Sequence, residues 1–468
     1  MRIYSMGAAE EVTGSKHFID TGNSLVMLDC GAFQGKRAEA DKKNRDFPVD
    51  PGLIECVVLT HGHFDHSGLI PLLVRNGYRG NIFATPATRD IANIIMMDSA
   101  RIQARDMEFL AKEADKRGED FKWEPLYDER DAIKAASQFV TISYGRPIRI
   151  TKDLELTFYD AGHILGSSIA VFRNDTRDGP ITLAYSGDLG RKGKPIIKDP
   201  ERIPDPDYLI LESTYGDRLH ESSGDVMGLL ADVVCRTAER GGKLIIPAFA
   251  IERTQELVFY LHLLNDRKMI PKIPIFVDSP MATNATTLFT LHPECYDEET
   301  NRAFIDHHRN PFGFNDLRYV QSVAESKQLN ELKGPAVIIS ASGMCESGRI
   351  QHHLLHNLSD EKNTILSVGY MAEHTLGRKI MNGAPEVSIL GRWVKVKAEV
   401  AEIKALSAHA DYRELGDYVK FMDLDRLKGV FLVHGEKEAQ DHLREHLLDL
   451  GVKNVSIMAK GQKFDLKP

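Results

Sequence analysis

Residues 56–66 read CVVLTHGHFDH, an apolar run that leads directly into His61-Gly62-His63-Phe64-Asp65-His66. Alternate residues of an extended segment share a face, so His61 and His63 can hold one cation. Asp65 and His66 follow as the chain turns and can hold a second cation. Unpaired polar groups at the end of a buried strand are costly, which disfavours a chance cluster of surface histidines. The stretch therefore predicts a metal centre.

Three more residues of ligand type occur at or just after the end of an expected strand. His163 follows LTFYDAG, Asp188 follows LAYSG and His434 follows VFLV. Because strand ends gather on one side of a sheet, these residues can meet the histidine cluster. One arrangement uses them all: His61, His63 and His163 around a first cation, Asp65, His66 and His434 around a second, and Asp188 between the two. Nitrogen and oxygen ligands without thiolates suit zinc, with manganese or iron as alternatives.

Taken singly, a His or Asp after a strand is more often a cap or turn residue than a ligand. Gly162 and Gly187 favour the ligand role for their neighbours His163 and Asp188, because glycine lets the backbone approach an ion closely.

The composition is that of a folded protein of two or three domains, with 468 residues, 42% of them hydrophobic and 27% charged. No apolar run is long enough to span a bilayer and the N-terminus has no signal pattern, so we expect a cytoplasmic protein without a membrane partner. The net charge of -9 argues against a nucleic-acid binder but does not exclude one, since cations can create a local positive site. The 5 cysteines are scattered, and we expect each to be a small core residue.

The pattern of the chain changes near Gly241. The part before it is rich in short strands, interrupted by a helical stretch from about Ala87 to Gln138 that reads as an amphipathic pair of surface helices. Four units follow, beginning at KLIIP, IPIFV, AVIIS and NTILS, in which an apolar run leads into a turn of small residues; a helical pattern follows the first three. After about Gly391, VAEIKALSAH and GVFLVHGE resume the first pattern. We expect an α/β protein in which a domain with a parallel sheet interrupts another domain.

These motifs resemble those of a known family. HGHFDH, with Asp29, His163, Asp188 and His434 in this order, resembles the signature of the metallo-β-lactamase superfamily. The segments LILESTYG, PAFAIERTQEL, VDSPMA, ASGMCESGR and LSAHADY resemble its β-CASP branch, which processes nucleic acids. The chain is similar to prokaryotic relatives of the nuclease subunit of the cleavage and polyadenylation specificity factor.

The resemblance implies an αββα sandwich interrupted by a Rossmann-like α/β insertion. We place the N-terminal part of the sandwich at 1–215, the inserted β-CASP domain at 216–391 and the C-terminal part at 392–468. It also implies a ribonuclease that acts on single-stranded RNA with two Zn²⁺ per chain, or Mn²⁺ in their place. A homodimer is expected from the family alone.

Two cations about 3.5–4 Å apart lower the pKa of water and offset charge on a phosphate, which gives in-line hydrolysis with 3′-hydroxyl and 5′-phosphate products. The resemblance implies that Asp65 and Asp188 serve catalysis through the metals. It makes His409 the general acid and Glu212 the carboxylate that keeps His409 protonated. A carboxylate that caps a turn is the alternative for Glu212, whereas Asp29 is expected to orient a ligand histidine.

Several residues are expected to contact the substrate. Backbone N–H groups in the turn at Ser342 and Gly343, guanidinium groups and a stacking aromatic ring favour phosphates and bases. The full set is Tyr215, Arg253, Ser342, Gly343, Thr375 and Arg378; solvated arginines and a core tyrosine are the alternatives. The family usually has GTLGR where this chain has HTLGR, so His374 either alters contacts with RNA or metal, or points to solvent.

Three rival functions share parts of this pattern. A hydrolase of small esters, thioesters or lactams would lack the region 241–391. A DNA nuclease of the same branch would differ around His409. An inactive scaffold would have lost metal ligands. The chain ends soon after His434, without the further C-terminal domain usual in ribonuclease J relatives. We therefore expect an endonuclease, with 5′ exonuclease activity left open.

Overall fold

The computed structural model describes residues 1–35, 37–47, 49–118, 120–176, 178–220, 225–305, 309–369, 371–372, 374–403 and 406–468. The chain divides into two compact units. Unit 1 comprises Met1–Leu219 and His409–Pro468, and unit 2 comprises His220–Ala408. The chain thus leaves unit 1, forms unit 2 and returns. The domain limits inferred from the sequence stay a prediction.

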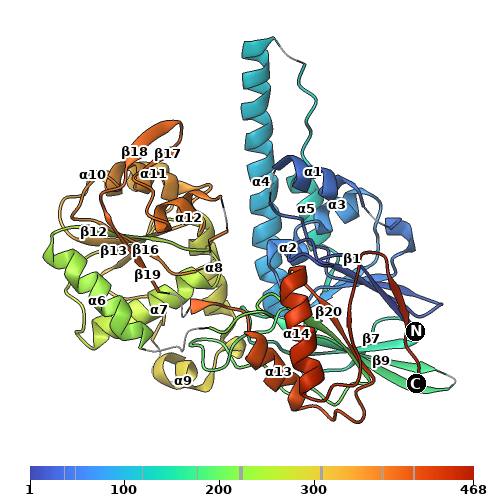
Figure 1. Ribbon diagram of the computed structural model, residues 1–468. Helices are drawn as coiled ribbons and strands as arrows, with labels where there is room; N and C mark the ends of the chain where they lie inside the picture. The colour runs from blue at the N-terminus through green and yellow to red at the C-terminus, as the bar shows by residue number, and fades with distance from the viewer. Residues whose placement is uncertain are drawn as a thin grey trace. The chain divides into compact units, whose positions relative to one another are not determined.

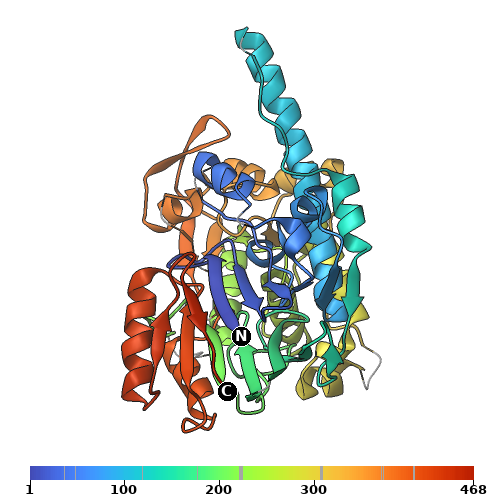
Figure 2. The same ribbon diagram turned by 90° about the vertical axis from the view of Figure 1, so that its right-hand side faces the viewer.

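Unit 1 is built on two mixed β-sheets. The first has the strand order β22 (Lys463–Asp465), β1 (Arg2–Gly7), β2 (Lys16–Asp20), β3 (Leu25–Leu28), β4 (Cys56–Val58), β5 (Asn81–Ala84) and β6 (Phe139–Thr141). The second has the order β21 (Val455–Ile457), β20 (Gly429–Val433), β11 (Tyr208–Glu212), β10 (Gly179–Tyr185), β9 (Ser168–Thr176), β8 (Leu154–Asp160) and β7 (Ile148–Arg149). Strand β22 pairs with β1, so the two ends of the chain lie side by side, as Figures 1 and 2 both show.

Three apolar clusters define the layers of unit 1. The first joins the facing sides of the two sheets and includes Val58 and Phe83 from one and Phe158 and Phe172 from the other. The second packs helices against the outer side of the first sheet, and the third does so for the second sheet. The helices of the second cluster are α3 (Ile70–Arg75), α4 (Pro86–Arg117) and α5 (Glu129–Ala136). Those of the third cluster are α13 (Tyr412–Lys420) and α14 (Lys437–Asp449). The predicted αββα sandwich is confirmed; α1 (Arg37–Arg45), η1 (Pro51–Leu53) and α2 (Phe64–Ser67) lie in its loops.

The helical stretch expected over residues 87–138 forms the predicted pair, α4 and α5. The Thr85 side chain accepts a hydrogen bond from Thr88 N–H at the start of α4, and Gly118 ends the helix at φ 66°. The buried residues of α4 end at Ala100, and the rest of the helix extends beyond the neighbouring elements of unit 1 in Figures 1 and 2.

Unit 2 contains a parallel sheet. Its strand order is β14 (Leu317–Tyr319), β13 (Ile275–Val277), β15 (Ala336–Ser340), β12 (Lys243–Pro247), β16 (Thr364–Ser367) and β19 (Glu399–Glu402). The helices and turns of the unit are α6 (Val226–Glu239), α7 (Arg253–Asp266), α8 (Pro280–Leu291), η2 (Pro293–Cys295), α9 (Glu298–Thr300), η3 (Asn301–Ile305), α10 (Val323–Glu331), α11 (Arg349–Asn357) and α12 (Leu376–Met381). A hairpin of β17 (Glu386–Ile389) and β18 (Arg392–Lys395) stands outside the sheet.

Two details of unit 2 differ from the sequence-based expectation. A helix, α12, follows the fourth strand unit as well as the first three, and its six residues are too few to show a helical period. Strand β19 pairs with β16, so part of the segment VAEIK belongs to the sheet of unit 2 rather than to the first pattern. A short strand carries no signal for the partner with which it pairs.

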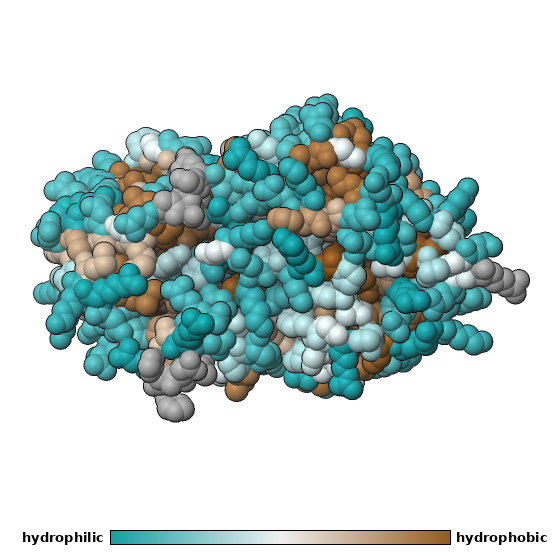
Figure 3. Space-filling model, turned by 90° about the horizontal axis from the view of Figure 1, so that it is seen from below, coloured by the Kyte–Doolittle hydropathy of each residue, from teal (hydrophilic) through white to brown (hydrophobic). Residues whose placement is uncertain are grey.

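Among the residues that the structure describes, no helix combines the length and the hydropathy needed to cross a membrane. The face of the molecule in Figure 3 is mainly hydrophilic. Four cysteines are buried, but Cys235 on α6 is partly exposed, which corrects the expectation that each cysteine lies in the core.

Candidate metal centre

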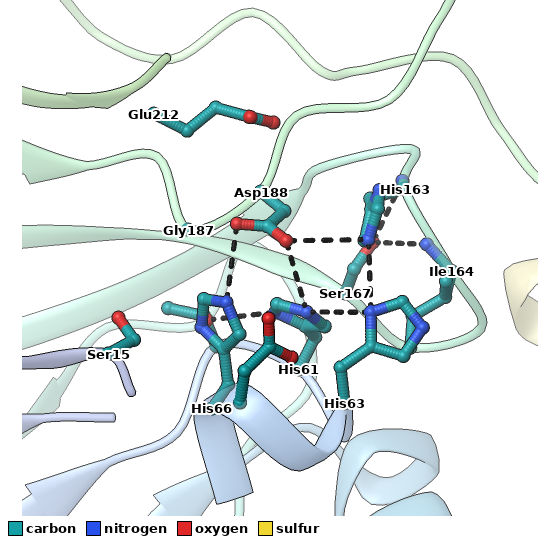
Figure 4. A network of polar contacts seen from close by, with 12 residues as sticks. Ser15, His61, His63, His66, His163, Ile164, Ser167, Gly187, Asp188 and Glu212 are labelled. Carbon is teal, nitrogen blue, oxygen red and sulfur yellow. Dashed lines mark hydrogen bonds and ion pairs between the residues drawn. The ribbon is translucent and has the colours of Figure 1, made fainter. Parts of the chain in front are cut away.

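The topology of the second sheet brings the expected ligands together. Strands β10, β11 and β20 are parallel neighbours, and β8 has the same direction because two antiparallel pairings relate it to β10. Their carboxyl ends therefore lie along one edge of the sheet. Asp188 and His163 follow β10 and β8, Glu212 ends β11, and His434 follows β20. Residues 61–66, after β4 of the first sheet, meet them at this edge (Figure 4).

The first group of side chains has the dimensions of a tetrahedral zinc site. His63 Nδ1 lies 3.2 Å from His61 Nε2 and 3.3 Å from His163 Nε2. Asp188 Oδ2 lies 3.5 Å from His61 Nε2 and 3.6 Å from His163 Nε2. For zinc–nitrogen bonds of about 2.0–2.1 Å, neighbouring corners of a tetrahedron are about 3.3 Å apart. The four side chains thus fit a single cation.

The second group adjoins the first through Asp188. His66 Nε2 lies 3.1 Å from His434 Nε2, and His434 Nε2 lies 3.6 Å from Asp65 Oδ2. The other oxygen of Asp188, Oδ1, lies 3.4 Å from His66 Nε2 and 3.5 Å from His434 Nδ1. One carboxylate therefore faces both groups, and all seven expected ligands lie in one cluster.

The polar atoms of this cluster do not satisfy one another. Asp188 Oδ1 and His163 Nδ1 are buried and have no hydrogen-bond partner among the residues that the structure describes. Burial holds the pKa of His61 and of His163 well below the usual value, so both rings are neutral, which is the form that binds metal. Burial opposes the charge of His66 too, but Asp188 and Asp29 outweigh it and raise the pKa of His66 to about 10. A buried carboxylate oxygen without a hydrogen-bond partner, close to two neutral rings, favours a bound cation.

Asp29 orients the second group from behind. Its Oδ2 lies 2.7 Å from His66 Nδ1, and its carboxylate accepts hydrogen bonds from Thr60 N–H at 2.8 Å and from the Tyr185 hydroxyl at 2.8 Å. The bond to Nδ1 leaves His66 Nε2 directed at the cluster, as a ligand requires. The backbone also turns at Asp29, whose φ is 56°.

Beyond Asp29 a buried chain of polar groups continues between the sheets. The Ser15 hydroxyl lies 3.2 Å from the Tyr185 hydroxyl and 3.0 Å from His17 Nε2, and Ser5 Oγ lies 2.7 Å from His17 Nδ1. Sequence reasoning missed these residues. Only the place of Tyr185, directly before the SGD motif, marks one of them in the sequence.

Close packing around glycine fixes the backbone of the ligand loop. An added Cβ at Gly31 would lie 1.5 Å from the carbonyl oxygen of Asp65. The backbone N–H of Cys30 donates to the carbonyl of His66 at 2.7 Å, which ties the two loops together. Gly162 and Gly187, which favoured the ligand role of their neighbours, have φ of 62° and 54°.

His409 and Glu212 form an ion pair beside the cluster. His409 Nδ1 lies 3.2 Å from each oxygen of Glu212 and 3.8 Å from Asp188 Oδ2. Burial disfavours the charged ring, but the Glu212 carboxylate outweighs it and raises the pKa of His409 to about 9. Glu212 also accepts from Thr214 N–H at 3.3 Å, so the turn-capping role exists together with the ion pair. The ring of Tyr215 lies edge-on to His409, with 5.9 Å between ring centroids.

Four of the five expected substrate contacts of unit 2 form hydrogen bonds or ion pairs within that unit. Arg253 is buried and paired with Glu256. Ser342 N–H donates to Ser347 O at 3.2 Å and therefore cannot bind a phosphate in this conformation; buried Gly343 lies in the same turn. Both residues lie in the expected turn between strand β15 and helix α11, and the helix begins at Arg349.

The other two expected contacts, Thr375 and Arg378, lie at the start of α12. Thr375 caps this helix by accepting from Arg378 N–H at 3.2 Å, and Arg378 Nε donates to Met371 O at 3.0 Å. His374, where the family usually has glycine, is exposed and has φ 69°. The left-handed conformation explains the usual glycine.

Comparisons with known proteins match the three parts of the chain separately. Residues 13–78 match the metallo-beta-lactamase superfamily, residues 254–380 match the Beta-Casp domain, and residues 393–458 match the Zn-dependent metallo-hydrolase RNA specificity domain.

Relatives cover the chain from end to end. Ribonuclease TTHA0252 of Thermus thermophilus is 37% identical over 465 residues, which are 99% of each protein. The transcription termination factor FttA of Methanosarcina mazei is 31% identical over 94% of this chain and 67% of the factor, and that of Methanocaldococcus jannaschii is 33% identical over 93% and 67%. A crystal structure of a protein of unknown function from Enterococcus faecalis V583 has a TM-score of 0.56, at 12% identity over 99% of both chains, and shares the fold.

We expect Gly31→Ala to weaken zinc binding at least tenfold, because its Cβ must displace the backbone that carries Asp65 and His66. Competition with a chromophoric chelator measures the affinity. Gly369→Ala is the control, because a Cβ at Gly369 meets nothing within 4 Å. Wild-type zinc affinity in Gly31→Ala would contradict the assignment.

We expect His374→Gly to raise the free energy of unfolding by up to about 1 kcal/mol, because glycine relieves the left-handed backbone at φ 69°. Urea titration followed by circular dichroism measures this change. His352→Gly, at an exposed position inside α11, should lower the free energy of unfolding by about 1 kcal/mol. A loss of stability in His374→Gly would show that the imidazole makes a contact that outweighs the strain.

Proposed function

The chain belongs to the β-CASP branch of the metallo-β-lactamase superfamily, and from this premise we propose that it is a zinc-dependent ribonuclease that hydrolyses single-stranded RNA. The observation that carries the proposal is the single carboxylate, Asp188, that faces ring nitrogens of both ligand groups at 3.4–3.6 Å. A relative of equal length is named a ribonuclease, and residues 393–458 match a domain named for RNA specificity. The Beta-Casp match argues against a hydrolase of small esters or thioesters.

Two zinc ions per chain are proposed, with His61, His63, His163 and Asp188 holding one, and Asp65, His66, His434 and the same Asp188 holding the other. Manganese is the alternative metal. When bound, the two ions would lower the pKa of a water nucleophile and offset the charge that develops on the phosphate.

Proton transfer to the leaving group falls to His409. Its Nδ1 is held by Glu212, which leaves Nε2 for donation to the 3′ oxygen. With a pKa of about 9 the ring is protonated at neutral pH, and it lies beside Asp188, where the reacting phosphate would bind. Because water is the nucleophile, the products are a 3′-hydroxyl and a 5′-phosphate, and the ribose 2′-hydroxyl takes no part in the chemistry. Tyr215, beside His409, is proposed to stack on a base.

Cleavage within the RNA chain is proposed as the main activity, with 5′ exonuclease cleavage as a second activity. In unit 2, Arg253, Ser342, Thr375 and Arg378 stay candidates for RNA contacts. Each already has a partner within the unit, so binding of RNA would have to rearrange or extend these contacts.

We expect the purified protein to contain about two zinc ions per chain, and His63→Ala to contain fewer. Inductively coupled plasma mass spectrometry of protein dialysed against metal-free buffer measures the content. His352→Ala, on an exposed helix position outside the cluster, should keep the wild-type content. Protein that binds no transition metal would contradict the proposed centre.

We expect the zinc-loaded protein to cut end-labelled single-stranded RNA internally, and chelator to abolish the cutting. His63→Ala should lose it, and His409→Ala should be slower by about a hundredfold or more, because each removes a group used in the transition state. Gel analysis of RNA and of DNA of the same sequence separates internal cuts from release of 5′ nucleotides, and circular dichroism checks the fold. If His63→Ala cuts RNA as well as wild type does, the proposed mechanism is wrong.

A further inference from the structure

Among the described residues of unit 2, the most exposed aromatic side chain lies on the hairpin of β17 and β18. Trp393 on β18 is 72% exposed, and Leu390 in the turn is 51% exposed. Figure 1 shows the hairpin of β17 and β18 extending beyond the helices of unit 2, and Figure 2 shows it from the side. None of the residues proposed for catalysis lies in it.

The hairpin is anchored on one face and open on the other. Val387 and Ile389 are 3% and 1% exposed and belong to the apolar core of unit 2. The register pairs Ser388 with Trp393, so the indole stands on the opposite face. Anchoring holds this surface in place, which lowers the entropic cost of binding a ligand on it.

The turn of the hairpin contains an unusual residue. Leu390 and Gly391 have φ of 50° and 76°, the left-handed pair of a two-residue hairpin turn. Asparagine or aspartate is favoured at the first of these positions. A leucine there combines an unfavourable backbone conformation with exposed apolar surface, which stability of the fold does not explain.

The hairpin and the residues that follow it carry more cations than acids. Residues 386–397 contain the cations Arg392, Lys395 and Lys397 and one acid, Glu386, in a chain whose net charge is -9. All three cations are exposed, and within the described parts of the chain none forms an ion pair, although Glu386 stands opposite Lys395 in the register of the hairpin. Lys395 is on the face of Trp393, about 6.7 Å further along the strand.

From these observations we infer that the hairpin of β17 and β18 is a binding site for single-stranded RNA, with Trp393 stacking on a base and Arg392, Lys395 and Lys397 contacting phosphates. Every base offers a π face to an aromatic ring, and unpaired cations attract the backbone that links the bases. A duplex would hide its bases from the indole. The site rests on the proposed function, because it would bind the substrate of the same enzyme.

Binding without cleavage is the first test. Fluorescence anisotropy with a fluorescein-labelled 30-nucleotide oligouridine, in chelator, measures affinity for the full-length protein. We expect Trp393→Ala to bind at least fivefold more weakly, and Trp393→Phe to stay within about threefold of wild type, because phenylalanine also stacks. Lys395→Gln should reduce the slope of log affinity against log salt by about 0.7. Phe109→Ala, which removes a 63% exposed aromatic ring from α4, is the matched control and should bind like wild type.

Cleavage separates this site from the proposed function. In the zinc-loaded enzyme, Trp393→Ala should raise KM for the long RNA and leave kcat, and the rate on a chromogenic phosphodiester without bases, unchanged. Wild-type RNA affinity in Trp393→Ala overturns the hairpin site even if the wild-type enzyme cuts RNA. Weaker RNA binding in Trp393→Ala, in a protein that cuts no RNA, supports the site and contradicts the ribonuclease.

Two other ligands of the hairpin, a lipid surface and a second copy of the chain, would give different results in binding experiments. If Trp393→Ala loses binding to vesicles of phosphatidylserine and phosphatidylcholine but not to RNA, the hairpin contacts lipid and the inference is wrong. A change in sedimentation coefficient from dimer to monomer in Trp393→Ala, with RNA affinity unchanged, assigns the hairpin to self-association and also overturns it.

Discussion

The carboxylate of Asp188 faces ring nitrogens of both histidine groups at 3.4–3.6 Å while its side chain is 2% exposed. A charged group so far from water needs compensating positive charge. His66 and His409, whose pKa values are raised, supply part of it, but His61 and His163 are neutral and one oxygen of Asp188 has no hydrogen-bond partner among the described residues. The strand order that brings four strand ends to one edge of the sheet is therefore best understood as a frame for cations.

The ligand side chains are oriented by neighbouring groups that do not themselves bind the cations. Asp29 receives hydrogen bonds from the backbone and hydroxyl of Thr60 and from Tyr185, and these leave it a single orientation toward His66. Buried polar networks whose members are satisfied are rigid, because any rotation leaves a donor or acceptor unpaired in a medium of low dielectric. The ligand positions are in this way set by the protein before a metal binds, and the tight contact at Gly31 adds a steric limit.

The sequence predicted the metal centre well because its signal is local: ligand types, their spacing and the apolar runs before them. Pairings across sheets leave no such signal. Ser15 and Tyr185 meet although 170 residues separate them, so the network behind Asp29 was missed. The sequence was incomplete at Arg253 for a different reason. The spacing of three residues indicates that Glu256 can pair with Arg253 on a helix, but it does not indicate that the pair is buried. The pairing of His409 with Glu212 was expected only from the family resemblance.

The acidic character of the chain limits how the enzyme can attract a polyanion. At physiological ionic strength charges are screened beyond about 8 Å, so the net charge of -9 acts weakly on a bound RNA, and the charges nearest to it decide the affinity. Near the metal centre those charges are the cations and protonated His409. On unit 2, Arg253 is neutralised by Glu256, whereas Lys395 forms no ion pair with any residue that the structure describes. Contact with RNA must therefore come from few, local positive groups, which makes their position on the surface more important than their number.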